Sequence, residues 1–164
     1  RLVEFGRTKG MDLRQGDITT LENETFDLII LSHVLEHVPD LNTFMTQIDK
    51  HLNQNGYVYI EVPDISEFCM GAFQTAHIYY FTIPHLNYLC AQFQLTPITT
   101  KNIGPFFFGI YKRSLDTVEY TTVPNEYLRL RKIIKKHELR ERIKIFFKKT
   151  GLFSIIRSIV NSFR

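Results

Sequence analysis

Residues 26–40 read FDLIILSHVLEHVPD, and this stretch decides the fold of the chain. Its first six residues, Phe26 to Leu31, are large and apolar apart from one aspartate. A continuous apolar run of this length is typical of a strand buried on both faces of a parallel sheet. Ser32 and His33 follow directly, and polar residues at the carboxyl end of such a strand lie where α/β folds bind their ligands. We therefore expect a ligand site just after this strand.

A helix and a second strand are predicted downstream of this stretch. Asp40 or Asn42 can cap the start of the helix, and Asn55-Gly56 supplies a left-handed stop. Tyr57 to Val62 has the composition of a strand, so strand, helix and strand form a right-handed parallel unit. The apolar residues of the helix recur at helical spacing on one face: Leu41, Phe44, Met45, Ile48 and Leu52.

Three further strands are predicted, at residues 12–15, 95–100 and 106–112. Pro84 fits the first turn of a second helix. The buried face of that helix is expected to carry Leu86, Leu89, Cys90 and Phe93.

The order and spacing of these segments resemble class I S-adenosylmethionine (SAM) dependent methyltransferases. The quoted stretch is similar to the family pattern FDxIxxxxVLEHxxD, and HLNQNGYVYIEVPD at residues 51–64 resembles the family's fifth strand. His77 to Thr82 resembles its HxxxF(T/S) element. The resemblance covers about residues 1–113 and rests on the order of the motifs. It implies an α/β, Rossmann-like sheet of parallel strands with an antiparallel closing pair, and SAM as the cofactor.

The resemblance also implies roles for individual residues. In the family, a Gly-Asp pair after the third strand packs on the adenine, which places Asp17 beside the exocyclic amine and Ile18 on the ring face. A carboxylate accepts a hydrogen bond from such an amine, although Gly-Asp is also a common turn pair. Ser32 and His33 are expected beside the methionine part of the cofactor, and His37 is expected either to pack on the cofactor or to cap the turn.

His33 and His77 are the candidate general bases, which would assist a hydroxyl acceptor. Each can instead be a hydrogen-bonded structural histidine. His33 and His37 are four residues apart and would share one side of a helical turn, a spacing that can hold a metal ion. No HExxH sequence accompanies them, so we predict no metal site. Glu36, between them, is predicted to be structural.

The chain departs from the family pattern at its start. In the family, a Gly-rich turn lets backbone amides approach SAM, and an acid after the second strand binds the ribose hydroxyls. Neither is found here, since Gly6, Gly10 and Gly16 do not form that pattern. We therefore expect the C-terminal two-thirds of a methyltransferase domain, which on its own should bind SAM poorly or not at all. The strand at 12–15 should be detached, or should pair directly with the edge of residues 26–31.

Charge divides the chain into two regions. Residues 1–126 carry 8 Lys and Arg against 15 Asp and Glu, whereas residues 127–164 carry 12 against 2. We expect a partial methyltransferase domain over 1–114, a connector over 115–126 and a basic amphipathic helical tail over 127–164. The tail is predicted to form two helices hinged at Gly151.

The tail suggests a second class of function. A basic amphipathic helix can lie on an anionic membrane surface or bind a partner protein, and it can contact nucleic-acid phosphates. The apolar stripe from Leu152 to Phe163 favours a membrane or a protein over nucleic acid, because phosphate binding does not need that apolar area. The alternative is an ordinary helical pair packed on the body.

Two functions follow from these features. The first is SAM-dependent methyl transfer to a small-molecule or glycan-precursor acceptor, and the second is a non-catalytic remnant that binds through its basic tail. Hydrophobic residues make up 44% of the chain, which argues against disorder. No apolar run reaches the ~18 residues of a transmembrane helix. The two isolated cysteines favour a reducing, cytoplasmic setting.

Overall fold

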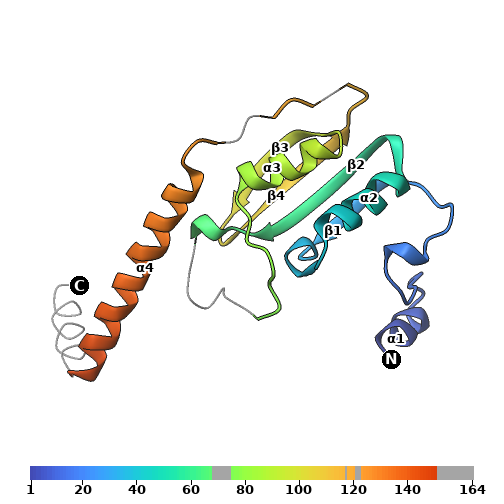
Figure 1. Ribbon diagram of the computed structural model, residues 1–164. Helices are drawn as coiled ribbons and strands as arrows, with labels where there is room; N and C mark the ends of the chain where they lie inside the picture. The colour runs from blue at the N-terminus through green and yellow to red at the C-terminus, as the bar shows by residue number, and fades with distance from the viewer. Residues whose placement is uncertain (68–74, 117, 121–122, 151–164) are drawn as a thin grey trace, which may run out of the picture.

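One mixed sheet organises the described part of the chain (Figure 1). The computed structural model describes residues 1–67, 75–116, 118–120 and 123–150. The strands of the sheet, in the order β1-β2-β4-β3, are β1 (Phe26–Ser32), β2 (Leu52–Pro63), β4 (Phe106–Arg113) and β3 (Leu95–Ile103). The helices are α1 (Leu2–Thr8), α2 (Leu41–His51), α3 (Ile83–Gln92) and α4 (Glu126–Lys149), with short 3-10 turns η1 (Ile18–Thr20), η2 (Leu35–His37) and η3 (Ile65–Glu67).

β1, α2 and β2 form the predicted parallel unit. β1 pairs in parallel with β2, and Ser32 at its end lies opposite Glu61. Asp40 begins α2, because its carboxylate accepts a hydrogen bond from the N–H of Thr43 at 3.1 Å. The unit brings the carboxyl ends of both strands to the same edge of the sheet.

The predicted antiparallel closing pair is confirmed. β4 lies between β2 and β3 and runs antiparallel to both. The β3–β4 hairpin turns at Gly104, whose φ of 71° is a conformation that glycine adopts without steric cost. α3 begins with Pro84 in its first turn, as predicted, and packs on these two strands. Together with the parallel unit, this confirms the predicted fold class.

The core lies between one face of the sheet and helices α2 and α3, which cover that same face in Figure 1. Alternate residues of β2, namely Val58, Ile60 and Val62, point into this core and are fully buried. On β1, Leu28 and Ile30 are 53% and 62% exposed. The prediction that β1 is buried on both faces is therefore wrong, because the described residues bury only one of its faces.

Residues 12–15, predicted as a strand, form none. A strand needs a neighbour for its backbone groups, and here the segment turns back on α1 instead. The N–H of Met11 donates to the carbonyl of Gly6 at 3.2 Å, and the Arg7 side chain donates to the carbonyl of Leu13 at 2.8 Å. The segment is detached from β1, which is one of the two arrangements expected for it.

The predicted helix stop at Asn55-Gly56 is also wrong. α2 ends at His51, and β2 begins at the next residue. Leu52 is 2% exposed and lies opposite Phe26, with an irregular register just after this pair. A Cβ on Gly56 would lie 2.7 Å from the Leu52 side chain. This glycine therefore makes room for a core leucine and does not end the helix.

α4 confirms the helix predicted from Tyr127 to Thr150, within one residue at each end. Its first turn contains Glu126, which is 7% exposed and accepts two hydrogen bonds from Arg129 of the same helix at 2.7 Å. These bonds lower the pKa of the Glu126 carboxyl. Arg129 also donates to Ser66 Oγ at 3.1 Å. The second helix predicted after Gly151 lies outside the described residues. None of the described helices has the length and hydrophobicity that a membrane span requires.

We expect the thiol of Cys90 to resist modification in the folded protein. It lies in α3 and is fully buried, and this burial raises the pKa of the thiol well above its usual range. In a Cys69→Ser variant, labelling by a thiol reagent should be at least ~1,000-fold slower in buffer than in denaturant, because only the rare unfolded molecules react. Labelling in buffer at the rate of a free cysteine would contradict this placement of α3.

Candidate active site

The carboxyl end of β1 presents Ser32 and His33 beside Glu61 of β2. Ser32 Oγ donates to Glu61 Oε2 at 3.3 Å, and the Tyr59 hydroxyl donates to the same oxygen at 3.0 Å. His33 has a left-handed backbone with φ of 54°, which is uncommon for a residue other than glycine. Its ring lies edge-on to Phe106, with 4.8 Å between the ring centroids. The chain therefore turns sharply here and keeps the imidazole at the edge of the sheet.

A buried carboxylate, Glu36, lies at the centre of the following loop. η2 carries it into the interior, where it is 1% exposed. His33 Nδ1 lies 3.1 Å from Glu36 Oε1, and His37 Nε2 lies 4.0 Å from the same oxygen. A buried carboxylate that accepts from an imidazole fixes the tautomer and the orientation of the ring. Glu36 is therefore able to position His33.

His77 reaches the same carboxylate from a distant part of the chain. The N–H of Ile78 donates to the carbonyl of Glu36 at 2.7 Å, and His37 Nδ1 lies 2.9 Å from the carbonyl oxygen of Ala76. These contacts place the His77 ring 4.8 Å from the His37 ring, measured between centroids. The three histidines that the sequence singles out thus gather around one carboxylate, which the sequence did not mark as a site residue.

Asp17 and Ile18 line a pocket of about 290 Å³ at the start of α2. Asp17 caps η1, since its Oδ1 accepts a hydrogen bond from the N–H of Thr19 at 2.9 Å. Hydrogen bonds from the Thr19 hydroxyl and N–H lower the pKa of Asp17. The Gly-Asp pair is therefore a turn, and this turn also places Asp17 in a pocket. The opposite wall consists of Val38, Pro39, Asp40, Thr43 and Phe44.

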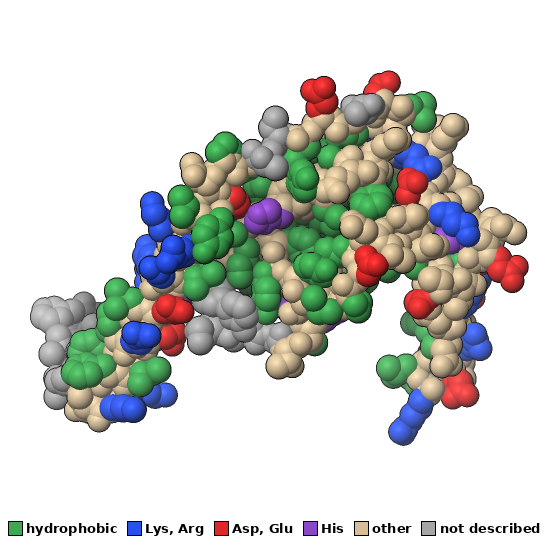
Figure 2. Space-filling view, viewed as in Figure 1, with side chains coloured by type: hydrophobic (Ala, Val, Ile, Leu, Met, Phe, Trp, Pro, Cys, Tyr) green, Lys and Arg blue, Asp and Glu red, His purple; other side chains and the backbone are tan. Residues whose placement is uncertain are grey.

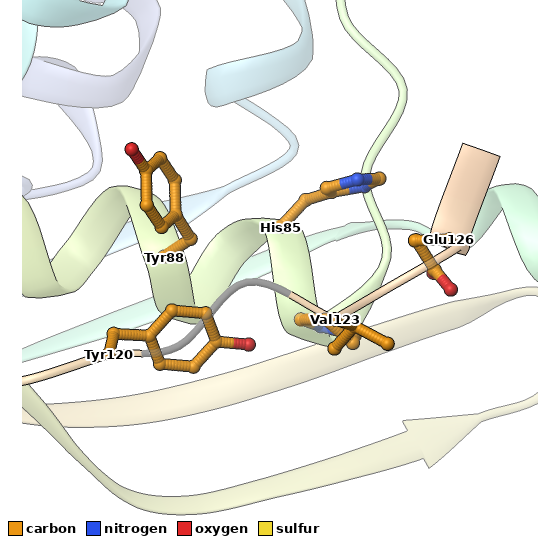
Figure 3. A pocket seen from close by; sticks show the side chains of 6 residues that line it. His85, Tyr88, Tyr120, Val123 and Glu126 are labelled. Carbon is orange, nitrogen blue, oxygen red and sulfur yellow. The ribbon is translucent and has the colours of Figure 1, made fainter.

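A second pocket, of about 270 Å³, lies between α3 and the connector that leads to α4 (Figure 3). In Figure 3, His85 and Tyr88 project from α3, and Tyr120 and Val123 project from the connector. His85 Nδ1 lies 3.1 Å from the hydroxyl of Thr82. The sequence did not mark this pocket, because its residues on α3 lie outside the predicted buried face of that helix and its other wall comes from the connector. The residues around it are Pro84, His85, Tyr88, Tyr120, Val123 and Glu126.

Solved structures share this fold at low sequence identity. A SAM-dependent methyltransferase from Thermotoga maritima matches with a TM-score of 0.56 and 16% identity, over 68% of this chain and 68% of that chain. A SAM-dependent methyltransferase from Methanosarcina mazei matches with a TM-score of 0.54 and 14% identity, over 70% of this chain and 78% of that chain. These likenesses show the class I methyltransferase fold.

The family itself is shown by sequence. A sequence model described as a methyltransferase domain matches residues 6–100, which is more than half of the chain. The chain therefore belongs to the methyltransferase domain family. A 1,6-didemethyltoxoflavin-N1-methyltransferase from Burkholderia thailandensis matches with a TM-score of 0.49 and 21% identity. The match covers 59% of this chain and 48% of the length of that enzyme. No curated protein sequence matches the chain.

Proposed function

We propose that this chain supplies the acceptor side and the adenine side of a SAM-dependent methyltransferase active site. The observation that carries the proposal is the extent of the family match. Residues 6–100 include both the Asp17 pocket and the loop of His33 and Glu36. For the acceptor we retain the class that the sequence resemblance implies, a small molecule or a glycan precursor.

The Asp17 pocket fits the adenine of SAM. Its ionised carboxylate uses Oδ1 to cap η1, so we assign Oδ2 as the acceptor for the exocyclic amine. Ile18 and Phe44 supply apolar surface for the ring faces. The pocket continues into the loop that follows η2, so an adenine bound here would point the rest of the cofactor along the edge of the sheet where Ser32 and His33 lie.

The chemistry needs few groups from the protein. SAM carries a methyl group on a sulfonium centre that is already activated, so the main task of the side chains is to position the acceptor. We propose that His33 takes the proton from a hydroxyl acceptor through Nε2, while Nδ1 is held by Glu36. Ser32 and Glu61 form the neighbouring polar wall. His77 is the second candidate base, and its ring lies beside His37.

Asp17→Asn should raise the Kd for SAM about tenfold, the effect of losing one hydrogen bond. Asparagine keeps an oxygen to cap Thr19 but can turn its N–H2 group toward the adenine amine, so the turn survives while the acceptor is lost. The measurement is calorimetry of SAM binding to the natural full-length protein. Asp12→Asn is the matched control, because Asp12 is exposed and lies outside the pocket. Equal Kd values for Asp17→Asn and wild type would exclude this role.

We also propose that α4 binds an anionic membrane surface. Its sequence carries ten Lys and Arg against three Glu, and Figure 2 shows these cations interspersed with hydrophobic side chains along the helix. Among the latter, Leu139, Ile143 and Phe146 are 59%, 45% and 60% exposed. Each Lys or Arg near an anionic bilayer contributes about 1 kcal/mol, and salt screens this attraction.

Vesicle co-sedimentation tests this second proposal. The full chain should pellet with phosphatidylserine-containing vesicles at low salt, and a variant with Lys132, Lys135 and Lys136 changed to Gln should pellet much less. Vesicles of neutral lipid are the control. Equal pelleting with neutral and anionic vesicles would exclude the proposal, and capture of a protein with no lipid binding would point to the partner-protein alternative.

A further inference from the structure

Glu36, His37 and His77 form a compact group of metal-ligand side chains. Each offers one ligand atom, a carboxylate oxygen or an imidazole nitrogen, and these atoms all lie within 4.8 Å of one another. η2 supplies the adjacent Glu36 and His37. The hydrogen bond from the N–H of Ile78 to the carbonyl of Glu36, at 2.7 Å, holds His77 against them. The backbone therefore brings the three side chains together.

Two atoms of the group are buried without a hydrogen-bond partner among the described residues. They are Glu36 Oε2 and His77 Nδ1. His33 accounts only for the other carboxylate oxygen, Oε1, at 3.1 Å. A buried polar atom without a partner costs about 1–3 kcal/mol, and more when it is charged. One carboxylate oxygen and one imidazole nitrogen are therefore available to bind a ligand.

His37 is oriented as a metal ligand would be. Its Nδ1 lies 2.9 Å from the carbonyl oxygen of Ala76, which can only accept a hydrogen bond, so Nδ1 carries the proton. In the neutral ring, Nε2 then has a lone pair, and it lies 4.0 Å from Glu36 Oε1. Metal-bound histidines are typically held by this same bond from the other ring nitrogen to a backbone carbonyl.

We propose that Glu36, His37 and His77 bind a divalent transition-metal ion, for which Zn²⁺ is the probe. One carboxylate and two imidazoles are the donor set of open zinc sites that keep a coordination position for water or substrate. Two nitrogen donors disfavour Mg²⁺ and Ca²⁺, which prefer oxygen ligands. This group differs from the His33–His37 pair considered in the sequence, because its third member comes from residue 77 and its carboxylate is buried.

Zinc titration of the full chain, purified without a histidine tag, tests the site directly. With a chromophoric chelator as competitor, wild type should bind Zn²⁺ at one site. Glu36→Gln and His77→Ala should each raise the Kd by more than the roughly 10- to 100-fold that outer-shell changes cause. His85→Ala is the matched control, because its imidazole lies in the other pocket and outside the group. Binding that is unchanged in both Glu36→Gln and His77→Ala would overturn the proposal.

Thermal unfolding provides a second readout that does not depend on methyl transfer. Zn²⁺ should raise the Tm of wild type and of His85→Ala over their values in EDTA, since a ligand of the native state stabilises it. The rise should be absent in His77→Ala, whose side chain is only half-buried and whose fold can be checked by circular dichroism. A rise with Mg²⁺ that equals the rise with Zn²⁺, or no rise with either ion, would show that the imidazoles do not bind a transition metal.

Discussion

His33→Ala should lower kcat of the natural full-length protein by about 10²–10⁴-fold with a hydroxyl acceptor, the range that positioned general bases contribute. The expectation follows from two distances. Nδ1 of His33 lies 3.1 Å from the buried carboxylate of Glu36, which fixes the ring and leaves Nε2 without a proton in the neutral form. Nε2 lies 3.7 Å from Glu61 Oε1, beyond hydrogen-bonding distance. This nitrogen is therefore in place to accept a proton at the edge of the sheet.

The base role and a merely structural role of His33 predict different kinetics. Loss of a base should lower kcat and leave the Kd for SAM within about threefold of wild type. Damage to the loop would raise the Kd for SAM as well, because the Asp17 pocket shares the residues that follow η2. His85→Ala, in the other pocket, should change neither constant. A kcat within twofold of wild type for His33→Ala would leave His77 as the only candidate base.

The helices and strands whose position depends on neighbouring residues in the sequence were predicted correctly. The apolar run at β1, the Asp40 cap of α2 and Pro84 in the first turn of α3 each depend on neighbouring residues in sequence. The wrong predictions about residues 12–15 and Asn55-Gly56 depend on tertiary partners. Residues 12–15 alternate as a strand does, but the carbonyl of Leu13 accepts a hydrogen bond from Arg7 of α1. Asn55-Gly56 has the composition of a helix stop, but Gly56 is needed for the packing of Leu52.

The candidate site was only partly predictable for the same reason. His33 and His37 lie near each other because both belong to one short loop, which sequence spacing can show. His77 joins them through backbone bonds across about 40 positions of sequence, which no local pattern can show. Glu36 gave one weak signal, a charged residue among Leu35 and Val38, and its near-complete burial became evident only in three dimensions. The resemblance to a family supplied Asp17 and Ile18, and local spacing alone would have left them as a turn.

Phe107→Ala should lower the free energy of unfolding by about 3–5 kcal/mol, the cost of deleting a fully buried aromatic ring. Phe107 is 0% exposed and lies on β4, the strand that joins the parallel unit to the hairpin. Phe107 lies opposite Val62 of β2 and Asn102 of β3. Removing its ring would therefore leave a cavity at the middle of the sheet, between β2 and β3. One layer of helices, α2 and α3, covers this face of the sheet.

Denaturant unfolding followed by circular dichroism measures this cost. Phe5→Ala is the matched control, because it makes the same substitution at a side chain that is 64% exposed, and its effect should stay within about 0.5 kcal/mol. The neighbouring Phe106 is a poor control, since its ring contacts His33. If Phe107→Ala and Phe5→Ala changed the midpoint equally, β4 would not be the central strand that carries the core.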